Sequence, residues 1–460
     1  MTPAAIITVI SAYFAVILFI SWFTGRKSDN AGFFSGNRKQ SWYVVAIAMI
    51  GSAMSGVTFV SVPGMVATSG FGYMQMALGF IAGQIVIAFV LIPLFYRMNL
   101  VSIYGYLENR FGLSSYRTGA WFFFISKMLG ASVRLYLVCI ALQMMVFGPL
   151  GLPFIVNVAV TVLILIAYTF RGGVKAVIWI DFLKTFCMIV SIALCTIFIS
   201  KSLGFTFGSM CEAVAGSDMS RIFYFDDPDH PQYFFKQFFG GMFTLIAMTG
   251  LDQDMMQRSL TCKNFRDSQK NIITSALLQT VVIFLFLTLG VLLYFFAWAN
   301  GIDATGDTLF PAVATSGLLP AVVGIVFVIG LVSCSYAAGG SALTALTTSF
   351  TVDILGTAGK SEKEVKSMRE KVHIGMAVCM GLTIAVFNFI NNTSAIDAVY
   401  KLASYTYGPI LGMFAFGILT KRRTKDRCVP WISIAAPAVC LVLQLNSERW
   451  FGGYQFSYEL

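Results

Sequence analysis

Four basic residues lie inside long apolar stretches of the chain: Lys127, Arg134, Lys184 and Lys401. A charged side chain at mid-membrane costs at least about 2.5 kcal/mol on insertion scales, so it needs a compensating role or a route to the interface. Such positions are typical of ion and substrate pathways. The chemistry that these residues predict is the binding of ions or of charged solutes.

Arg134 is the clearest candidate for binding an anion. It lies well inside the apolar stretch that begins near Tyr116. Its planar guanidinium could hold a solute carboxylate through two parallel hydrogen bonds, or it could reach the outer surface in a structural role. Lys401 follows Asp397 by one helical turn, a spacing that fits either an ion pair on one helix or part of a gate.

The sequence offers little that would support enzymatic chemistry. His230 and His373 lie near the ends of apolar stretches, and neither HExxH nor GxSxG occurs. The nine cysteines show no CxxC or other metal-ligand spacing, a pattern typical of small apolar residues in a helix core. We therefore expect no enzyme activity and no cofactor beyond a possible coupling ion.

Composition indicates a membrane protein. Hydrophobic residues make up 57% of the 460 residues and charged residues 11%, and the mean hydropathy is +0.79. These values exclude an ordinary soluble globule and predict an all-α protein that crosses the bilayer many times. Windows of roughly 20 residues predict about twelve spans, namely 4–24, 41–68, 74–96, 116–148, 153–169, 176–200, 231–250, 271–297, 319–355, 372–391, 397–420 and 428–447.

Most of the 31 lysines and arginines lie on alternate loops. This distribution follows the positive-inside rule, so the formal net charge of +10 indicates membrane topology and not nucleic-acid binding. It places the basic loops in the cytoplasm and predicts both termini outside the cell (plasma or inner) membrane. Basic residues follow the first span and do not precede it, so we expect a retained helix and no cleaved signal peptide.

The second predicted span is interrupted at mid-depth by GSAMSGVTFVSVPG (51–64). Unwound backbone persists in a membrane only where protein or an aqueous cavity satisfies it, and such breaks are typical of solute sites. The seventh span contains a comparable run, FFGGMFTLIAMTG (238–250). We predict a single transmembrane domain, 1–460, with an inverted repeat of about 41–200 and about 231–420 and a site between the two breaks.

Five segments in order resemble one family: VTFVSVPG (57–64), GGVKAVIWID (172–181), GLDQDMMQR (250–258), SALTALTTSFTVD (341–353) and YTYGP (405–409). Over nearly its whole length the chain resembles the solute:sodium symporters, which are sodium/glucose cotransporter-like. The resemblance implies a LeuT-type core of five-plus-five helices that works by alternating access. It also implies secondary transport of a small polar solute, a sugar or an organic acid, with sodium.

The resemblance places solute contacts beside the first break. On this chain they would be Ser55 and Thr58, with Phe59 as a stacking residue, Gln75 at the start of the next span and Arg134 deeper in the membrane. A serine or threonine hydroxyl in a span can instead bond to its own helix.

The resemblance also implies a sodium position between the first broken span and the ninth span. Its residues, with two from the sixth span, would be Gly51, Met54, Asp181, Lys184, Cys334, Ala337, Ala338 and Ser341. Carbonyls of Gly51, Met54 and Cys334 would be ligands. Ala337 and Ala338 stand where the family has hydroxyl ligands, and a methyl group cannot bind sodium.

Lys184 stands where the family pattern has glutamine, three residues after Asp181. It could reach the cytoplasmic interface, about two turns away, with its long stem. Alternatively, its ammonium fills the position that Ala337 and Ala338 leave without ligands, with Asp181 as its partner on the same helical face. Sodium coupling would then be weakened or lost, and a buried lysine could carry a proton instead.

The sequence thus predicts a sodium symporter, with proton-coupled or sodium-independent transport as the alternative and a non-transporting solute sensor as a third. The expected partners are a small solute, sodium or a proton, and the lipid bilayer. The chain ends at YQFSYEL (454–460) as another apolar pattern begins, so we expect longer relatives with further spans.

Overall fold

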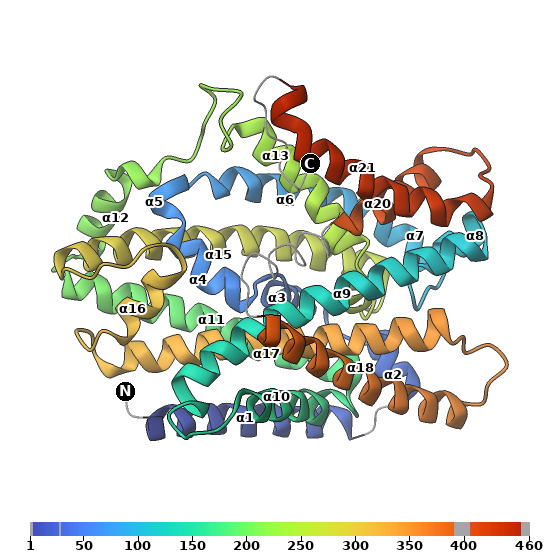
Figure 1. Cartoon of the computed structure of the whole chain (residues 1–460), viewed down its shortest axis with the longest axis horizontal. Coiled ribbons are helices and arrows are strands. Elements are labelled where there is room, and N and C mark those ends of the chain that lie inside the picture. Colours follow the sequence, from blue (N-terminus) through green and yellow to red (C-terminus); the bar gives the residue numbers. More distant parts are fainter. Residues whose placement is uncertain (1–2, 27–28, 391–404, 452–460) are drawn as a thin grey trace.

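The computed structural model describes residues 3–26, 29–390 and 405–451, and the chain in these ranges is built from helices and their connections (Figure 1). Long helices such as α1, α11, α15 and α17 lie roughly along one direction of the molecule. The one strand-like pairing within the described ranges is an isolated bridge between Gln40 and Cys262. The predicted all-helical fold is confirmed.

The first half of the chain contains α1 (Pro3–Gly25), α2 (Asn30–Ser35), α3 (Trp42–Ala53), α4 (Gly56–Gly64), α5 (Val66–Ser69), α6 (Tyr73–Val86), α7 (Ile92–Arg97), α8 (Gly105–Arg110), α9 (Leu113–Leu142), α10 (Phe154–Thr169) and α11 (Gly173–Ser202). The second half contains α12 (Phe207–Ala215), α13 (Phe234–Leu245), α14 (Gln253–Ser259), α15 (Phe265–Ala299), α16 (Leu309–Thr315), α17 (Ala321–Ser349), α18 (Glu362–Ile390), α20 (Tyr407–Leu419) and α21 (Val429–Trp450).

Each predicted span overlaps one or more helices within the described ranges. Within the described ranges, eight helices are long and apolar enough to cross a membrane, and counting each of the two bent pairs as one span gives up to ten. Two shorter apolar helices, α10 and α20, coincide with the fifth and eleventh predicted spans. Residues 391–404, which include part of the predicted span 397–420 together with Asp397 and Lys401, lie outside the described ranges. The number twelve and the inverted repeat stay predictions.

The first predicted break is present but shorter than expected. Helices α3 and α4 meet at 67°, and only Met54 and Ser55, both extended, separate them. Ser55 accepts a hydrogen bond from the backbone N–H of Thr58, and the Thr58 hydroxyl accepts one from the N–H of Ser55, so α4 begins with a capping box. The backbone resumes as helix at Gly56 and is not unwound through to Gly64, as the sequence had led us to expect.

The second predicted break lies just beyond the segment in which it was expected. Helix α13 continues through Gly250 by way of a π-helical turn, Ile246–Gly250. The chain then bends by 72° into α14. Asp252 starts α14 by accepting a hydrogen bond from the N–H of Met255 at 3.1 Å. The bend is therefore fixed by the capping aspartate and not by the glycine pair earlier in the helix.

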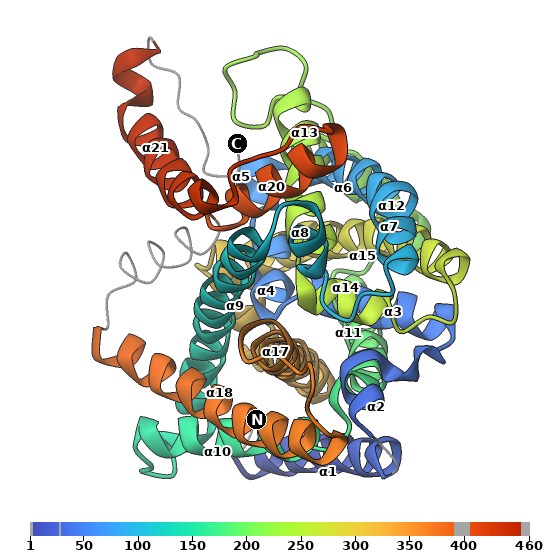
Figure 2. The ribbon, with the colours of Figure 1, turned by 90° about the vertical axis from the view of Figure 1, so that its right-hand side faces the viewer.

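Glycines in the membrane helices allow close helix packing. Helix α13 packs extensively against α6, where a Cβ on Gly79 would lie 2.1 Å from the carbonyl oxygen of Phe238 and one on Gly241 would lie 2.5 Å from that of Met76. Helix α11 likewise packs extensively against α17 and α3. Seen from the side, α21 lies at the edge of the bundle (Figure 2), and few of its residues are buried.

Candidate functional site

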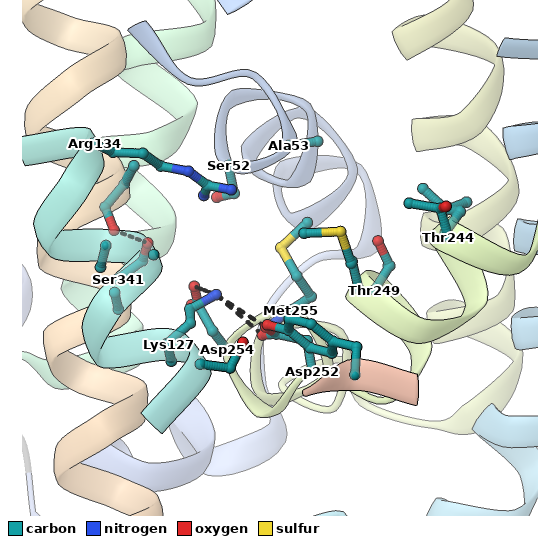
Figure 3. Close-up of a pocket in the computed structure, with 18 of the residues that line it drawn as sticks. Ser52, Ala53, Lys127, Arg134, Thr244, Thr249, Asp252, Asp254, Met255 and Ser341 are labelled. Atoms are coloured by element: carbon teal, nitrogen blue, oxygen red, sulfur yellow. Dashed lines mark hydrogen bonds and ion pairs between the residues drawn. The ribbon is translucent and has the colours of Figure 1, made fainter. Parts of the chain in front are cut away.

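A cavity of about 180 Å³ lies where the two bent pairs approach each other (Figure 3). Ser52 and Ala53, at the end of α3, form one part of its wall, and Thr249 and Asp252, at the second bend, form another. Helices α6, α9, α13 and α17, Gln279 of α15 and Tyr407 of α20 also contribute to the lining. The cavity therefore lies between the two bends, in the region where the sequence analysis predicted a site.

Two carboxylates of the second bend hold a lysine of α9. The Lys127 ammonium lies 2.8 Å from Oδ2 of Asp254 and 3.1 Å from Oδ2 of Asp252 (Figure 3). Asp252 also accepts a hydrogen bond from the Tyr407 hydroxyl at 2.6 Å. On its other side, Asp254 pairs with Arg258 one helical turn later, at 2.7 Å. Each of these charges thus has an opposite charge beside it, as buried charges require.

The charge network continues from α14 to α11 and α3. Nε of Arg258 lies 3.4 Å from Oδ2 of Asp181, and the same oxygen accepts a hydrogen bond from the Ser52 hydroxyl at 2.7 Å. Arg258 and Asp181 are almost fully buried. Because Ser52 lines the cavity, the network begins at the cavity wall with Lys127 and returns to it at Ser52.

Arg134 lies on the cavity wall, and its guanidinium extends toward Ser52 (Figure 3). The positive charge of Arg134 lies close enough to Lys184 and Asp254 to interact electrostatically with both. Among the described residues that line the cavity, the cations Lys127 and Arg134 face the carboxylates Asp252 and Asp254. Lys127 pairs with both of these carboxylates.

Lys184 is fully buried. Its ammonium has no hydrogen-bond partner among the described residues. Its stem passes Gly51, since the Lys184 Cδ lies 3.5 Å from the place where a Cβ on Gly51 would be. The interpretation in which the lysine reaches the interface requires an accessible ammonium, and the structure shows a buried one. Lys184 lies instead beside the end of α3, next to the predicted cation position.

The other predicted cation-site residues are divided between the cavity and the core. Ala338 and Ser341 line the cavity, and the Ser341 hydroxyl donates a hydrogen bond to the carbonyl of Ala338 at 3.1 Å. Met54 and Cys334 are buried in the apolar core, and Cys334 is an electrostatic neighbour of Lys184. Of Ala337 the structure describes only the helical backbone.

Four of the predicted solute contacts lie away from the cavity lining and bond or pack elsewhere. Ser55 and Thr58 bond to each other at the start of α4. Phe59 lies in an aromatic cluster, stacked on Phe310 with ring centroids 5.3 Å apart. Gln75 is fully buried and bonds to the loop before α13, where it accepts from the N–H of Tyr224 at 3.0 Å. None of these four is among the residues described as lining the cavity.

The acidic pair Asp252 and Asp254 is the part of the site that sequence reasoning did not assign. Both lie in the segment 250–258 that carried the family resemblance, and Arg258 follows Asp254 at helical i,i+4 spacing. Lys127 had been noted as a charge within a span but had no proposed partner. The sequence did contain a signal for this pairing. Asp252 and Asp254 follow Gly250 at the end of one predicted span, and Lys127 lies in another span without an assigned partner.

An all-helical membrane protein with two bent helix pairs around a charged cavity is, by its architecture, a secondary transporter. The family model of the sodium:solute symporter family matches residues 33–427. The chain belongs to this family, and it is therefore a multi-pass membrane transporter and not an enzyme.

Curated relatives match over most of their length. The sodium/sialic acid symporter NanT of Aliivibrio fischeri is 25% identical, over 96% of this chain and 88% of its own. The sodium-coupled monocarboxylate transporter 2 of Danio rerio is 24% identical, over 94% of this chain and 68% of its own. The sodium/sialic acid symporter SiaT of Proteus mirabilis is 24% identical, over 94% and 88%.

Two solved structures share the fold. A sodium-coupled sialic acid symporter, in a substrate-bound outward-open state, superposes with a TM-score of 0.83 at 19% identity, over 98% of this chain and 93% of that one. A transporter of the nucleobase-cation-symport-1 family in a closed conformation gives a TM-score of 0.52 at 13% identity, over 90% and 89%. These matches confirm the symporter fold that the sequence predicted.

Proposed function

We propose that the protein carries a small organic anion, a short-chain monocarboxylate, through the cavity between the two bent helix pairs. This proposal rests on the position of Arg134. The residue lines the cavity, and its guanidinium extends toward Ser52 (Figure 3). A guanidinium matches a carboxylate with two parallel hydrogen bonds. The relatives named for sialic acid and for monocarboxylates support an acid over a sugar.

The size of the cavity favours a short acid. It measures about 180 Å³, and a protein cavity of about 150 Å³ is known to hold benzene. A carboxylate with a chain of a few carbons fits such a volume with its charged end at Arg134. A large sugar acid would need a wider cavity than this conformation provides.

The proposed location is the cytoplasmic membrane, with the basic loops inside and both termini outside. The alternating distribution of lysine and arginine along the sequence supports this orientation. Transport would proceed by alternating access, as one group of helices moves against the other around the cavity.

Two modes of coupling are open for this carrier. Sodium symport is supported by the family and by the names of the relatives. Sodium-independent transport is favoured by one observation of this chain, the buried Lys184 beside Gly51. Sodium symport requires a sodium ion that binds to the protein and is released with the solute. In sodium-independent transport the positive charge is the Lys184 side chain, which stays in the protein.

The solute proposal is tested by counterflow into liposomes that contain the purified protein. Radiolabelled short monocarboxylates are expected to exchange, and neutral sugars are not. Arg134→Gln is expected to raise the apparent KM for the acid by at least about tenfold, since it removes a charged hydrogen-bond partner. Arg117→Gln, an exposed arginine on the same helix, is the matched control. Exchange of sugars, or equal kinetics of both variants, would contradict the proposal.

A further inference from the structure

The ammonium of Lys184 is a buried charge without a visible partner. Lys184 is 0% exposed, and its Nζ has no hydrogen bond to any described residue. One oxygen of Asp181, Oδ1, is equally buried and equally without a described partner. A buried ammonium without a partner is strongly destabilising, so a charged Lys184 requires oxygen ligands from the groups around it.

The end of α3, which the Lys184 stem approaches at Gly51, supplies oxygen atoms. The last hydrogen bond of that helix runs from the N–H of Met54 to the carbonyl of Ile50, and the N–H of Ser55 turns away to the Thr58 hydroxyl. The carbonyls at the end of a helix have no partner within it. They also carry the negative end of the helix dipole, which favours a cation. The first break therefore presents a row of oxygens suited to a monovalent cation.

Gly51 is what lets Lys184 reach this end of α3. A Cβ on Gly51 would lie 2.3 Å from Oγ1 of Thr185 and 2.8 Å from the carbonyl oxygen of Asp181, so any side chain there would force α11 away from α3. Without one, the Thr185 hydroxyl bonds to the carbonyl of Ile47 at 2.8 Å, and the Lys184 stem lies along the last turn of α3. Helix α11 also packs against α17.

We propose that the Lys184 ammonium is a tethered cation held at the end of α3, where it takes the place of a sodium ion, so that solute transport proceeds without sodium. This inference rests on the proposed function, because its uptake experiments use a short monocarboxylate as the solute. Asp181 lies one helical turn before Lys184 on α11 and accepts a hydrogen bond from Ser52 at 2.7 Å. Ser52 lines the cavity, so Asp181 connects the helix that carries the fixed charge to the cavity wall.

The first test needs no variant. Uptake of a radiolabelled short monocarboxylate by the wild-type protein in liposomes is compared in sodium chloride and in choline chloride, on both sides of the membrane and at equal ionic strength. The expected result is the same initial rate in the two salts. A rate at least about tenfold lower in choline would overturn the proposal.

The second test changes the tether. Lys184→Gln is expected to reduce uptake in choline by at least about tenfold, because the end of α3 loses its cation. Lys201→Gln serves as the matched control, since Lys201 is an exposed lysine at the far end of the same helix and its loss should leave the rate unchanged. Wild-type uptake by Lys184→Gln in choline would overturn the proposal.

A third measurement does not depend on the solute. A ligand that binds the folded state raises the melting temperature. The Tm of the purified wild-type protein is therefore expected to be the same in sodium and in choline, and a sodium-dependent increase would overturn the proposal. If no carboxylate enters in either salt while the Tm is indifferent to sodium, the solute class is wrong and the tethered cation stands.

Discussion

At the scale of single residues, the site consists of charges that share partners. Asp254 holds both Lys127 and Arg258, and Asp181 holds both Arg258 and Ser52. Removing one member of a buried ion pair is much more damaging than removing an exposed one, because the remaining charge stays in a medium of low dielectric constant. The network therefore predicts unequal effects for chemically identical substitutions.

Asp254→Asn is expected to destabilise the protein by about 3 kcal/mol or more, because two buried cations lose a common partner. Asp226→Asn is the matched control, since Asp226 pairs with Arg221 on the exposed surface and exposed pairs contribute little. Thermal unfolding followed by tryptophan fluorescence compares the two. Equal melting temperatures for both variants would show that the buried network is not a source of stability.

Restoring hydroxyls beside a neutralised Lys184 should restore a need for sodium. Lys184→Gln combined with Ala337→Ser and Ala338→Ser removes the tethered charge and adds hydroxyls at the two positions where the family resemblance implies hydroxyl ligands. We expect monocarboxylate uptake by this variant to recover only when sodium is present, whereas the Lys184→Gln single variant stays inactive in choline. Recovery that is equal in sodium and choline would argue against this interpretation of the two alanines.

At the scale of helices, glycines serve packing as much as bending. Gly51 was predicted as part of an unwound run, yet it lies within α3 and lets α11 approach. Gly241 was predicted at a break, yet it lies within α13 and lets α6 approach. A glycine inside an apolar stretch gives the same sequence signal in both cases. The actual bends are set by the capping residues Ser55 and Asp252.

Gly51→Ala tests the packing role. Its methyl group would meet the Thr185 hydroxyl and push α11, with Lys184, away from α3. We expect a lower Tm and a loss of uptake. Gly375→Ala in α18 is the control, because nothing lies within 4 Å of its Cβ position and alanine is the better helix former by about 0.5 to 1 kcal/mol. Full activity of Gly51→Ala would contradict the close approach.

The sequence was sufficient to predict the helical class, both bent spans and the neighbourhood of Arg134, Asp181 and Lys184. It was not sufficient for Ser55, Thr58 and Gln75, whose partners are a cap and a distant loop. Phe59 shows the same limit, since the rings around it come from other helices. Hydropathy identifies which stretches enter the membrane, but tertiary contacts decide which polar groups remain available to a solute.

At the scale of the whole molecule, a tethered cation changes the charge that crosses the membrane. A solute anion that moves with one sodium ion is electrically neutral, whereas an anion moved past a fixed lysine carries its own charge. Each 100 mV is worth about 2.3 kcal/mol per elementary charge. We expect an inside-negative potassium diffusion potential to slow monocarboxylate uptake and an inside-positive one to accelerate it. Uptake that ignores the potential would contradict a fixed charge.

The shared carboxylates of α14 have a consequence for the empty carrier. Lys127 on α9, Asp254 and Arg258 on α14 and Asp181 on α11 are joined in series, so separating α14 from either α9 or α11 breaks a buried ion pair. A buried charge that loses its partner is strongly destabilising, which makes partial openings at these contacts rare. Such a carrier should show little slippage, and small ions should not leak through it between turnovers.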